Sequence, residues 1–157
     1  MKTGQCTKYC YDRAIEVHGS PPCWYEGKGD DGYGSYTNAK YWTEHYRTPY
    51  EAKTNAYYPV AGDIIVFDGH YGHVAFVEEV HNDGTALISQ SNMDGNEEYS
   101  TIPNYKIGYP IDKSYGFKYT TGKVKGYLHY PEKKDLEDLK AELTAIRDEL
   151  TRIVNKM

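Results

Sequence analysis

The clearest pattern of apolar and polar positions runs from Ala61 to Asn92, AGDIIVFDGHYGHVAFVEEVHNDGTALISQSN. Three short apolar runs are separated by a glycine-rich segment and by an Asn-Asp-Gly sequence, both of which are typical of turns. Apolar runs of this length, bounded by such turn residues, predict three consecutive β-strands. His73 opens the middle strand, and the tripeptide Gln-Ser-Asn ends the last one.

The last two of these strands are expected to form a hairpin whose register can be estimated. A loop centred on Asn82 and Asp83 pairs residues whose numbers sum to about 165. His73 would then face Asn92, and the residue two positions after His73 would face Gln90. Because side chains alternate along a strand, His73, Gln90 and Asn92 would lie on one face of the sheet. A slip of two residues would keep the three together, whereas a slip of one residue would separate them.

A helix is predicted near the N-terminus, over residues 4–17. Thr3 is a suitable N-cap, and Gly19 follows directly after the expected end of the helix. Cys6 would lie in the first turn, where unpaired backbone amides and the helix dipole favour a negative charge. That position is expected to lower the pKa of the Cys6 thiol. Cys10 lies one turn further along and lacks this advantage.

The segment between this helix and the three strands has weaker signals. Residues 20–36 are rich in glycine, proline and aspartate, and we expect them to form a loop. A second short helix is predicted over residues 36–46, with Ser35 or Thr37 as its cap. Residues 47–59 are expected to be a further loop that leads into the first strand.

The segment after the three strands is predicted to begin without regular structure. We expect residues 93–115 to be irregular, and an irregular span of that length is more often functional than idle in a compact domain. Residues 115–120 and 123–130 are predicted to form a closing hairpin that turns at Thr121 and Gly122. Pro131 then marks a boundary.

The chain changes character after this proline. Residues 132–157 contain neither glycine nor an aromatic residue. Apolar residues recur there at alternating spacings of three and four: Leu136, Leu139, Leu143, Ile146, Leu150, Ile153 and Met157. This heptad pattern is typical of a coiled coil, although about three heptads are near the lower limit of stability. The segment is therefore a self-association helix, a helix packed on its own domain, or a helical linker to another module.

Composition limits the class of protein. The 157 residues and 18.0 kDa suit one globular domain with a substantial core. A net charge of −5 argues against a nucleic-acid-binding protein, which normally carries a basic face. No apolar run approaches the roughly 20 residues that cross a bilayer. The first residues, MKTGQCTKYC, lack the apolar core of a signal peptide, so synthesis in the cytoplasm is expected.

Two residue types bear on function. The chain holds 18 tyrosines but only 3 phenylalanines, and tyrosine suits wet clefts and carbohydrate-like ligands, although ordinary half-buried tyrosines would give the same count. The three cysteines, Cys6, Cys10 and Cys23, cannot all pair within one chain, which is compatible with a free reactive thiol. Cys10 and Cys23 are then either packed thiols or a disulfide pair.

Cys6, His73 and the amides that follow the histidine form a constellation typical of a cysteine hydrolase. The thiolate would attack a carbonyl carbon, and the imidazole would first hold the thiol proton and then deliver it to the leaving amine. A side-chain amide would accept a hydrogen bond from the other ring nitrogen and fix the tautomer. Spacing alone indicates this chemistry only weakly, since cysteine and histidine occur together in most proteins.

Metal sites are the competing chemistry. Six residues could offer ligands to zinc: Cys6, Cys10, Cys23, His70, His73 and His81. Their spacing matches neither a C-x-x-C nor an H-E-x-x-H motif. Asp30 and Asp31 could bind calcium, but the surrounding segment lacks the alternating acids and final glutamate of an EF-hand loop. We therefore expect no metal and no other cofactor.

Five segments follow one another in a specific order along residues 1–131: GQCTKYCYDRA, TNAKYW, PVAGDIIVFDG, YGHVAFVEEVHNDGTALISQSN and GYLHY. Together they resemble a CHAP domain, the cysteine- and histidine-dependent amidohydrolase/peptidase of phage endolysins and bacterial wall-remodelling enzymes. The resemblance implies an α+β fold of the papain-like type, with N-terminal helices packed on an antiparallel sheet. It also implies hydrolysis of an amide bond in peptidoglycan.

The resemblance assigns roles to individual residues. Cys6 in Gly-Gln-Cys-Thr matches the nucleophile of the family, and His73 in Gly-His-Val matches its general base. Asn92 matches the polar residue associated with the histidine, whereas Gln90 stands where many members have glutamate. Either Gln90 or Asn92 is therefore expected to orient His73. The backbone amide of Cys6, with Gln5 as a second donor, would stabilise the oxyanion.

The sequence thus predicts a peptidoglycan hydrolase, with a catalytic domain over residues 1–131 and a helical segment over 132–157. The bond cut would be the N-acetylmuramoyl-L-alanine amide or a peptide bond of the stem or cross-bridge. A phage endolysin is the expected setting, made in the host cytoplasm and acting on the wall, with neither nucleic acid nor membrane as partner. One alternative is a non-catalytic wall-binding or assembly module that acts through its coiled coil. Another is a secreted bacterial enzyme with a signal peptide upstream of Met1.

Overall fold

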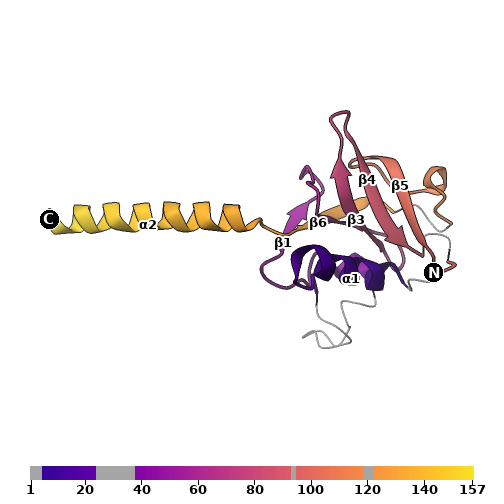
Figure 1. Cartoon of the computed structure of the whole chain (residues 1–157), viewed down its shortest axis with the longest axis horizontal. Coiled ribbons are helices and arrows are strands. Elements are labelled where there is room, and N and C mark those ends of the chain that lie inside the picture. Colours follow the sequence, from indigo (N-terminus) through magenta and orange to yellow (C-terminus); the bar gives the residue numbers. More distant parts are fainter. Residues whose placement is uncertain (1–4, 24–37, 93–94, 119–121) are drawn as a thin grey trace.

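A single antiparallel sheet organises the computed structural model, which describes residues 5–23, 38–92, 95–118 and 122–157 (Figure 1). Its six strands lie in the order β1-β6-β2-β3-β4-β5. They are β1 (Glu51–Thr54), β2 (Ile64–Phe67), β3 (His73–Val80), β4 (Thr85–Ser91), β5 (Tyr99–Lys106) and β6 (Val124–His129). The helices are α1 (Cys6–His18) and α2 (Lys133–Asn155), with short 3-10 helices η1 (Ala39–Tyr41) and η2 (Lys113–Tyr115). The predicted α+β class is confirmed.

Helix α1 lies against one face of the sheet and ends where the sequence predicted. Gly19 adopts a left-handed conformation with φ of 72° and donates its N–H to the carbonyl of Ile15, which closes the last turn. The start differs from the prediction, because the helix begins at Cys6. Gln5 is the N-cap, and its side chain makes no capping hydrogen bond. Thr3, the expected cap, lies outside the described residues.

Apolar side chains form one core on each face of the sheet. The core beneath α1 contains Cys10, Ala14, Cys23, Ala39, Trp42, Tyr50, Ile64, Val66, Val74, Phe76 and Leu128. The core on the other face contains Ile65, Phe67, Ala75, Val77, Ala86, Ile88, Ile102, Tyr105, Ile111, Phe117, Val124 and Tyr127. Consecutive residues of β2 and β3 enter opposite cores, as strand alternation requires. Cys10 and Cys23 are both buried and form no disulfide, so the disulfide alternative is wrong.

The β3–β4 hairpin has the predicted register near its open end. Phe76 pairs with Ser89, and Val77 pairs with Ile88, so the numbers of each pair sum to the expected value of about 165. The register then shifts by one between Val77 and Glu79. Glu78 therefore occupies a β-bulge, a feature that commonly re-aims a side chain.

The two strands that the sequence did not predict are the edges of the sheet. β1 lies in the expected 47–59 loop, and β5 lies in the expected irregular span 93–115. Both expectations are wrong because an edge strand buries little surface and need not show apolar alternation. β5 even contains Pro103, which an edge strand tolerates because one side of its backbone has no ladder partner.

The second helix and the closing hairpin are less extensive than the sequence predicted. Within residues 36–46 the described part forms only the 3-10 helix η1, capped by Asn38, while Ser35 and Thr37 lie outside the described residues. The closing hairpin is also absent from the described part of residues 115–130. β6 instead pairs with β1 and β2, and η2 precedes it with Asp112 as a side-chain cap. Long-range pairing in the sheet thus outweighed the local turn signal.

The predicted C-terminal helix is present as α2, and it projects away from the sheet (Figure 1). Every side chain described in it, from Glu137 onward, is exposed. The alternative that this helix packs on its own domain is therefore wrong for the described residues. Among the ranges that the structure describes, no helix combines the length and the apolar character needed to span a membrane.

Candidate active site

A pocket of about 740 Å³ opens where α1 begins. It lies between the N-terminal end of α1, the segment before β3 and the segment after β4. Its lining residues are Gln5, Cys6, Thr7, Asn38, Ala39, Asp68, Gly69, His70, Tyr71, Gly72, His73, Asn92, Gly95, Glu97 and Phe117. Three of the four predicted catalytic residues, Cys6, His73 and Asn92, therefore share one cavity.

Cys6 is the first residue of α1 and is partly exposed in the pocket. Its sulfur interacts with the backbone of Val74, the residue that follows His73, and with the backbone of Thr7. This contact brings the start of α1 to the start of β3. The structure thus places a thiol from the helix beside the strand that carries the histidine.

His73 is the first residue of β3, and only 3% of its surface is exposed. The edge of the ring packs against Phe117, with the two ring centroids 5.1 Å apart. Phe67 approaches from another side, at a centroid distance of 6.2 Å. The imidazole is therefore fixed between aromatic side chains on the wall of the pocket.

Gln90 is hydrogen-bonded to the ring of His73. Nε2 of His73 lies 2.6 Å from Oε1 of Gln90, and the Gln90 side chain is fully buried behind the ring. Because a carbonyl oxygen only accepts, Nε2 carries the ring hydrogen and Nδ1 is the basic nitrogen. The sequence left Gln90 and Asn92 as the two candidates for this contact with His73, and it is Gln90 that makes it.

Asn92 has other partners. Its Nδ2 donates to Oε1 of Gln5 at 2.7 Å, and its Oδ1 accepts from the backbone N–H of Glu97 at 3.1 Å. Asn92 also adopts a positive φ of 59°, which asparagine tolerates better than most residues. The strand alternation ends there, and the side chain turns from His73 to the residue that precedes Cys6.

Burial has the largest effect on the pKa values of Cys6 and His73. It raises the pKa of Cys6 to about 11, although hydrogen bonds from the backbone of Val74, Thr7 and Cys6 itself act in the opposite direction. The expectation that the helix start lowers this pKa is wrong, because desolvation is the larger effect. Burial also lowers the pKa of His73 to about 4, against the effect of the Gln90 hydrogen bond. Taken singly, each group is neutral at pH 7.

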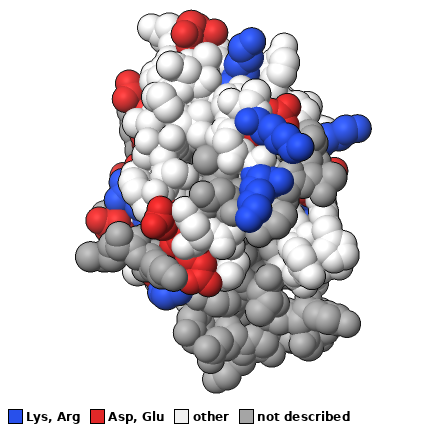
Figure 2. Space-filling model, turned by 90° about the vertical axis from the view of Figure 1, so that its right-hand side faces the viewer, with Lys and Arg blue, Asp and Glu red and all other residues white. Residues whose placement is uncertain are grey.

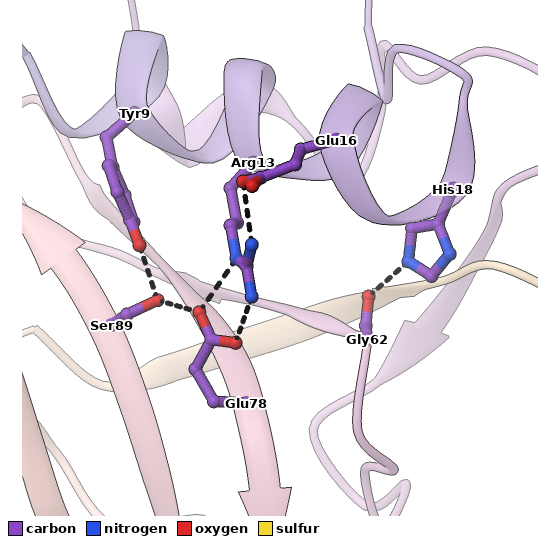
Figure 3. Close-up of polar contacts among 7 residues, drawn as sticks. All are labelled: Tyr9, Arg13, Glu16, His18, Gly62, Glu78 and Ser89. Atoms are coloured by element: carbon purple, nitrogen blue, oxygen red, sulfur yellow. Dashed lines mark hydrogen bonds and ion pairs between the residues drawn. The ribbon is translucent and has the colours of Figure 1, made fainter.

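A polar network holds α1 on the strands that carry His73 and Gln90 (Figure 3). Arg13 donates through Nε and Nη2 to the two carboxylate oxygens of Glu78, at 3.0 and 2.7 Å. Ser89 donates to the same carboxylate at 2.6 Å, and Tyr9 donates to Ser89 at 2.8 Å. Burial opposes the charge of Glu78, but the bonds from Arg13 and Ser89 outweigh it and hold the pKa of Glu78 below its ordinary value. The network fixes the helix that begins with Cys6.

Two further residues shape the pocket and were not predicted. Phe117 packs on His73 from the segment that was predicted as the first strand of a closing hairpin, and that prediction gave no indication of this contact. Gly72 has a φ of +73°, and a Cβ atom there would lie 2.3 Å from the backbone nitrogen of Lys40. The Gly-His pair in the sequence was the available signal for Gly72.

The face of the molecule drawn in Figure 2 carries charges of both signs. Figure 2 views the molecule from the side on which the chain begins in Figure 1. Positive side chains gather mainly at the upper right and negative ones mainly at the left, so this face is of mixed charge. Within the described ranges, no group of three or more His, Cys, Asp or Glu side chains is arranged to hold a metal ion. Asp30 and Asp31, the calcium candidates, lie outside those ranges.

Comparison with curated proteins gives relatives among staphylococcal enzymes. The N-acetylmuramoyl-L-alanine amidase sle1 of Staphylococcus epidermidis is 38% identical over 108 residues, which cover 66% of this chain and 29% of that protein. The protein of the same name from Staphylococcus aureus is 35% identical over 108 residues, covering 66% of this chain and 28% of that protein. The chain thus spans less than a third of the length of the curated relatives it matches.

Comparison with solved structures supports the fold. The crystal structure of Ly7917 aligns with a TM-score of 0.55 and 20% identity, over 83% of this chain and 54% of that chain. The sequence model of the CHAP domain matches residues 1–92, the part that carries Cys6, His73, Gln90 and Asn92. Since this match covers more than half of the 157 residues, the chain belongs to the CHAP domain family.

Proposed function

We propose that this chain is a peptidoglycan hydrolase that cleaves an amide bond with Cys6 as nucleophile and His73 as general base. One observation carries the proposal: Cys6 and His73 line the same open pocket, and Nε2 of His73 is held by Gln90. That bond leaves Nδ1 as the nitrogen that accepts a proton. A thiol, a base and an orienting group are the three parts of cysteine-dependent acyl transfer.

The reaction would begin with transfer of the Cys6 proton to Nδ1 of His73. The sulfur attacks the carbonyl carbon of the scissile amide, and the carbonyl oxygen becomes an oxyanion. The carbon–nitrogen bond then breaks as the imidazolium returns the proton to the leaving amine, which gives a thioester. His73 next removes a proton from water, the hydroxide releases the acyl group as a carboxylic acid, and the thiol is regenerated.

The pKa directions explain why the pair acts together. Burial opposes either ion alone, since it raises the pKa of Cys6 and lowers that of His73. A thiolate and an imidazolium formed side by side offset this cost by their mutual attraction, which is stronger in a site of low dielectric constant. Proton transfer is therefore coupled to the presence of both residues. Gln90 orients the ring without adding a charge.

The oxyanion would be stabilised at the start of α1. The backbone N–H of Cys6 is one of the first-turn amides that have no partner within the helix, and the helix dipole favours a negative charge there. Gln5 accepts from Asn92 through Oε1, so its amide group is held in place and its NH₂ is the end that can donate. Asn92 would thus be a positioning residue for Gln5.

We propose the N-acetylmuramoyl-L-alanine amide as the bond that is cut. The support is that the staphylococcal relatives carry this activity in their names. An endopeptidase acting on the stem or cross-bridge is the alternative within the same chemistry. The two differ in their products, because only the amidase separates whole peptides from the glycan strand.

The finer structural and biological assignments are part of the same proposal. The order of α1, β3 and β4, with Cys6 on the helix and His73 on the sheet, supports a papain-like fold over a catalytic domain of residues 1–131. A phage endolysin remains the proposed setting, and a secreted bacterial enzyme is the alternative. The genes beside the coding sequence distinguish them, since an endolysin lies among phage lysis genes.

Digestion of purified Gram-positive cell walls tests the function. The wild-type chain should release new amino groups, and mass spectrometry should find N-terminal alanine on peptides freed from glycan. Cys6→Ala should abolish release while keeping the fold, as judged by circular dichroism. Cys10→Ala is the matched control, because it removes a thiol outside the pocket. Wall binding without release of amino groups would instead support the non-catalytic binding module.

A further inference from the structure

The apolar side chains of α2 are exposed along the whole described helix. Leu139, Leu143, Ile146, Leu150 and Ile153 each expose between 50% and 64% of their surface, although such residues are normally buried in soluble proteins. They form one stripe, because they are three and four positions apart on a helix of 3.6 residues per turn. A contiguous exposed stripe of this kind marks an interaction surface.

The spacing assigns each residue to a heptad position. The a positions hold Leu143, Leu150 and Met157, and the d positions hold Leu139, Ile146 and Ile153. These a and d residues form the seam of the helix. A shallow groove runs beside the seam, and its lining residues are Leu143, Ile146, Arg147, Leu150, Thr151 and Val154. Val154 occupies an e position, so the apolar surface is wider than the a and d seam alone at the C-terminal end.

The charges beside the seam show which partner fits. Glu142 and Glu149 occupy g positions, whereas Lys140 and Arg147 occupy e positions. In a parallel coiled coil each g residue faces the e residue of the following heptad on the neighbouring chain, so Glu142 would face Arg147. An antiparallel arrangement would place e against e and g against g, so like charges would meet at Arg147 and at Glu149, and only Glu142 would face an opposite charge, that of Lys156. The surface is therefore complementary to another copy of itself in parallel orientation.

The residues in the seam also bear on the number of chains. Leucine at a with isoleucine at d favours assemblies of three or four helices over two in parallel coiled coils. Leu143 and Leu150 are at a, and Ile146 and Ile153 are at d. The apolar e residue Val154 agrees with this, since larger bundles bury more of the e and g positions.

We propose that α2 assembles copies of this chain into a parallel bundle of three or four helices. The occupant of the exposed stripe is thus the same helix of other copies. The helix is only about three heptads long, so assembly depends on protein concentration. The inference does not rest on the proposed function, because the readout of assembly is mass and not activity.

Sedimentation equilibrium of the full chain tests the assembly. The expected mass is three or four times 18.0 kDa at hundreds of micromolar, falling towards one chain on dilution. Leu143→Asp combined with Leu150→Asp should give a monomer whose sheet domain unfolds at an unchanged temperature. Ala141→Asp combined with Thr144→Asp, at exposed f and b positions outside the seam and the groove, is the matched control and should assemble like the wild type. A wild-type chain that stays monomeric or stops at a dimer overturns the proposal.

Cysteine cross-linking in a Cys6→Ala background tests the orientation. Met157→Cys should form disulfide-linked pairs with itself under mild oxidation. Leu139→Cys mixed with Met157→Cys should give no mixed pairs, because the two positions are roughly 27 Å apart along a helix. Mixed pairs in place of Met157→Cys self-pairs would show an antiparallel bundle and overturn the proposal.

Charge reversal tests the proposed pairing independently. Lys140→Glu with Arg147→Glu should lose assembly through repulsion between e and g residues. Mixing this variant with one carrying Glu142→Lys and Glu149→Lys should restore assembly, most completely as a tetramer in which the two variants alternate. Assembly of either variant alone at the wild-type concentration would contradict the proposed contacts.

Discussion

Nε2 of His73 lies 2.6 Å from Oε1 of Gln90, so a neutral amide, and not a carboxylate, holds the histidine. Gln90 can orient the ring but adds no negative charge to stabilise an imidazolium. His73 consequently has a pKa lowered to about 4 by burial, and the base remains unprotonated well into the acidic range.

Gln90→Glu should change the pH dependence of wall hydrolysis. A carboxylate beside His73 raises the pKa of the imidazole, so the acidic limb of kcat/KM should move to higher pH. Gln90→Leu removes the acceptor and should lower kcat on the order of 10- to 100-fold with little change in KM. If Gln90 had only a structural role, both substitutions would lower activity, and the acidic limb of kcat/KM would stay at the same pH.

His73→Ala should suppress the reactivity of Cys6. Without the imidazole, the thiolate lacks a partner ion and the burial-raised pKa of Cys6, about 11, governs its ionisation. Alkylation by iodoacetamide at pH 7 should slow by at least about tenfold, as followed by mass spectrometry of the Cys6 peptide. His70→Ala, which alters another histidine of the pocket wall, is the control. Equal alkylation rates in wild type and His73→Ala would contradict the coupling of the two residues.

Folding stability should fall in acid because His73 is buried in its neutral form. Its pKa is about 4 in the folded chain against an ordinary 6.5, so between these values the unfolded chain binds more protons. The contribution of His73 to folding stability therefore decreases as the pH falls from about 6.5 to 4 and does not change further below that, with a total effect of up to about 3 kcal/mol. Urea unfolding at several pH values measures it. His73→Gln should flatten this part of the profile, and an unchanged profile would argue against the shift.

Glu78→Gln should destabilise the fold by weakening the network that holds α1. The variant keeps the shape of the side chain but removes the charge that Arg13 contacts with two nitrogens, at an expected cost of about 1–3 kcal/mol. Glu79→Gln is the matched control, because the neighbouring side chain is exposed. Thermal unfolding compares the two. Equal melting temperatures would show that the Arg13–Glu78 pair contributes no net stability.

Gly72→Ala should damage the pocket more than an alanine at another glycine of positive φ. The new Cβ would meet the backbone of Lys40 at 2.3 Å, so the segment before His73 would have to move. Gly84→Ala has a similar φ of +83° but meets nothing within 4 Å, and it should cost only the strain of about 1–2 kcal/mol. We expect Gly72→Ala to lose more stability and also wall hydrolysis. Similar losses in both variants would mean that the contact with Lys40 is easily relieved.

The sequence predicted those parts of the structure that depend on local periodicity. The strands from Ile64 to Ser91 and the register near Ser89 follow from apolar runs and a short turn, and both are observed. The edge strands β1 and β5 have no such signature, because their residues are mostly exposed and their pairing is imposed by the neighbouring strand. Strand pairing between residues far apart in the chain also replaced the predicted closing hairpin.

Around the pocket, the same distinction applies to single residues. Strand alternation correctly predicted that Gln90 lies beside His73. It did not predict that Asn92 leaves the strand with a positive φ and forms a hydrogen bond with Gln5. Phe117 and the pair of Arg13 with Glu78 join segments that are distant in sequence, and no local pattern records such contacts. The lowered thiol pKa expected from the helix start failed because the sequence shows the position of Cys6 but not its desolvation.

Helix α2 leaves the sheet on the side opposite to the start of α1 (Figure 1), where Gln5 and Cys6 line the pocket. Its 23 residues form a rod of about 35 Å. A parallel bundle of such rods would gather the sheet domains at one end, with their pockets on the side away from the rods. An enzyme built in this way could hold several sites on one insoluble polymer, so that release from one strand leaves the others engaged.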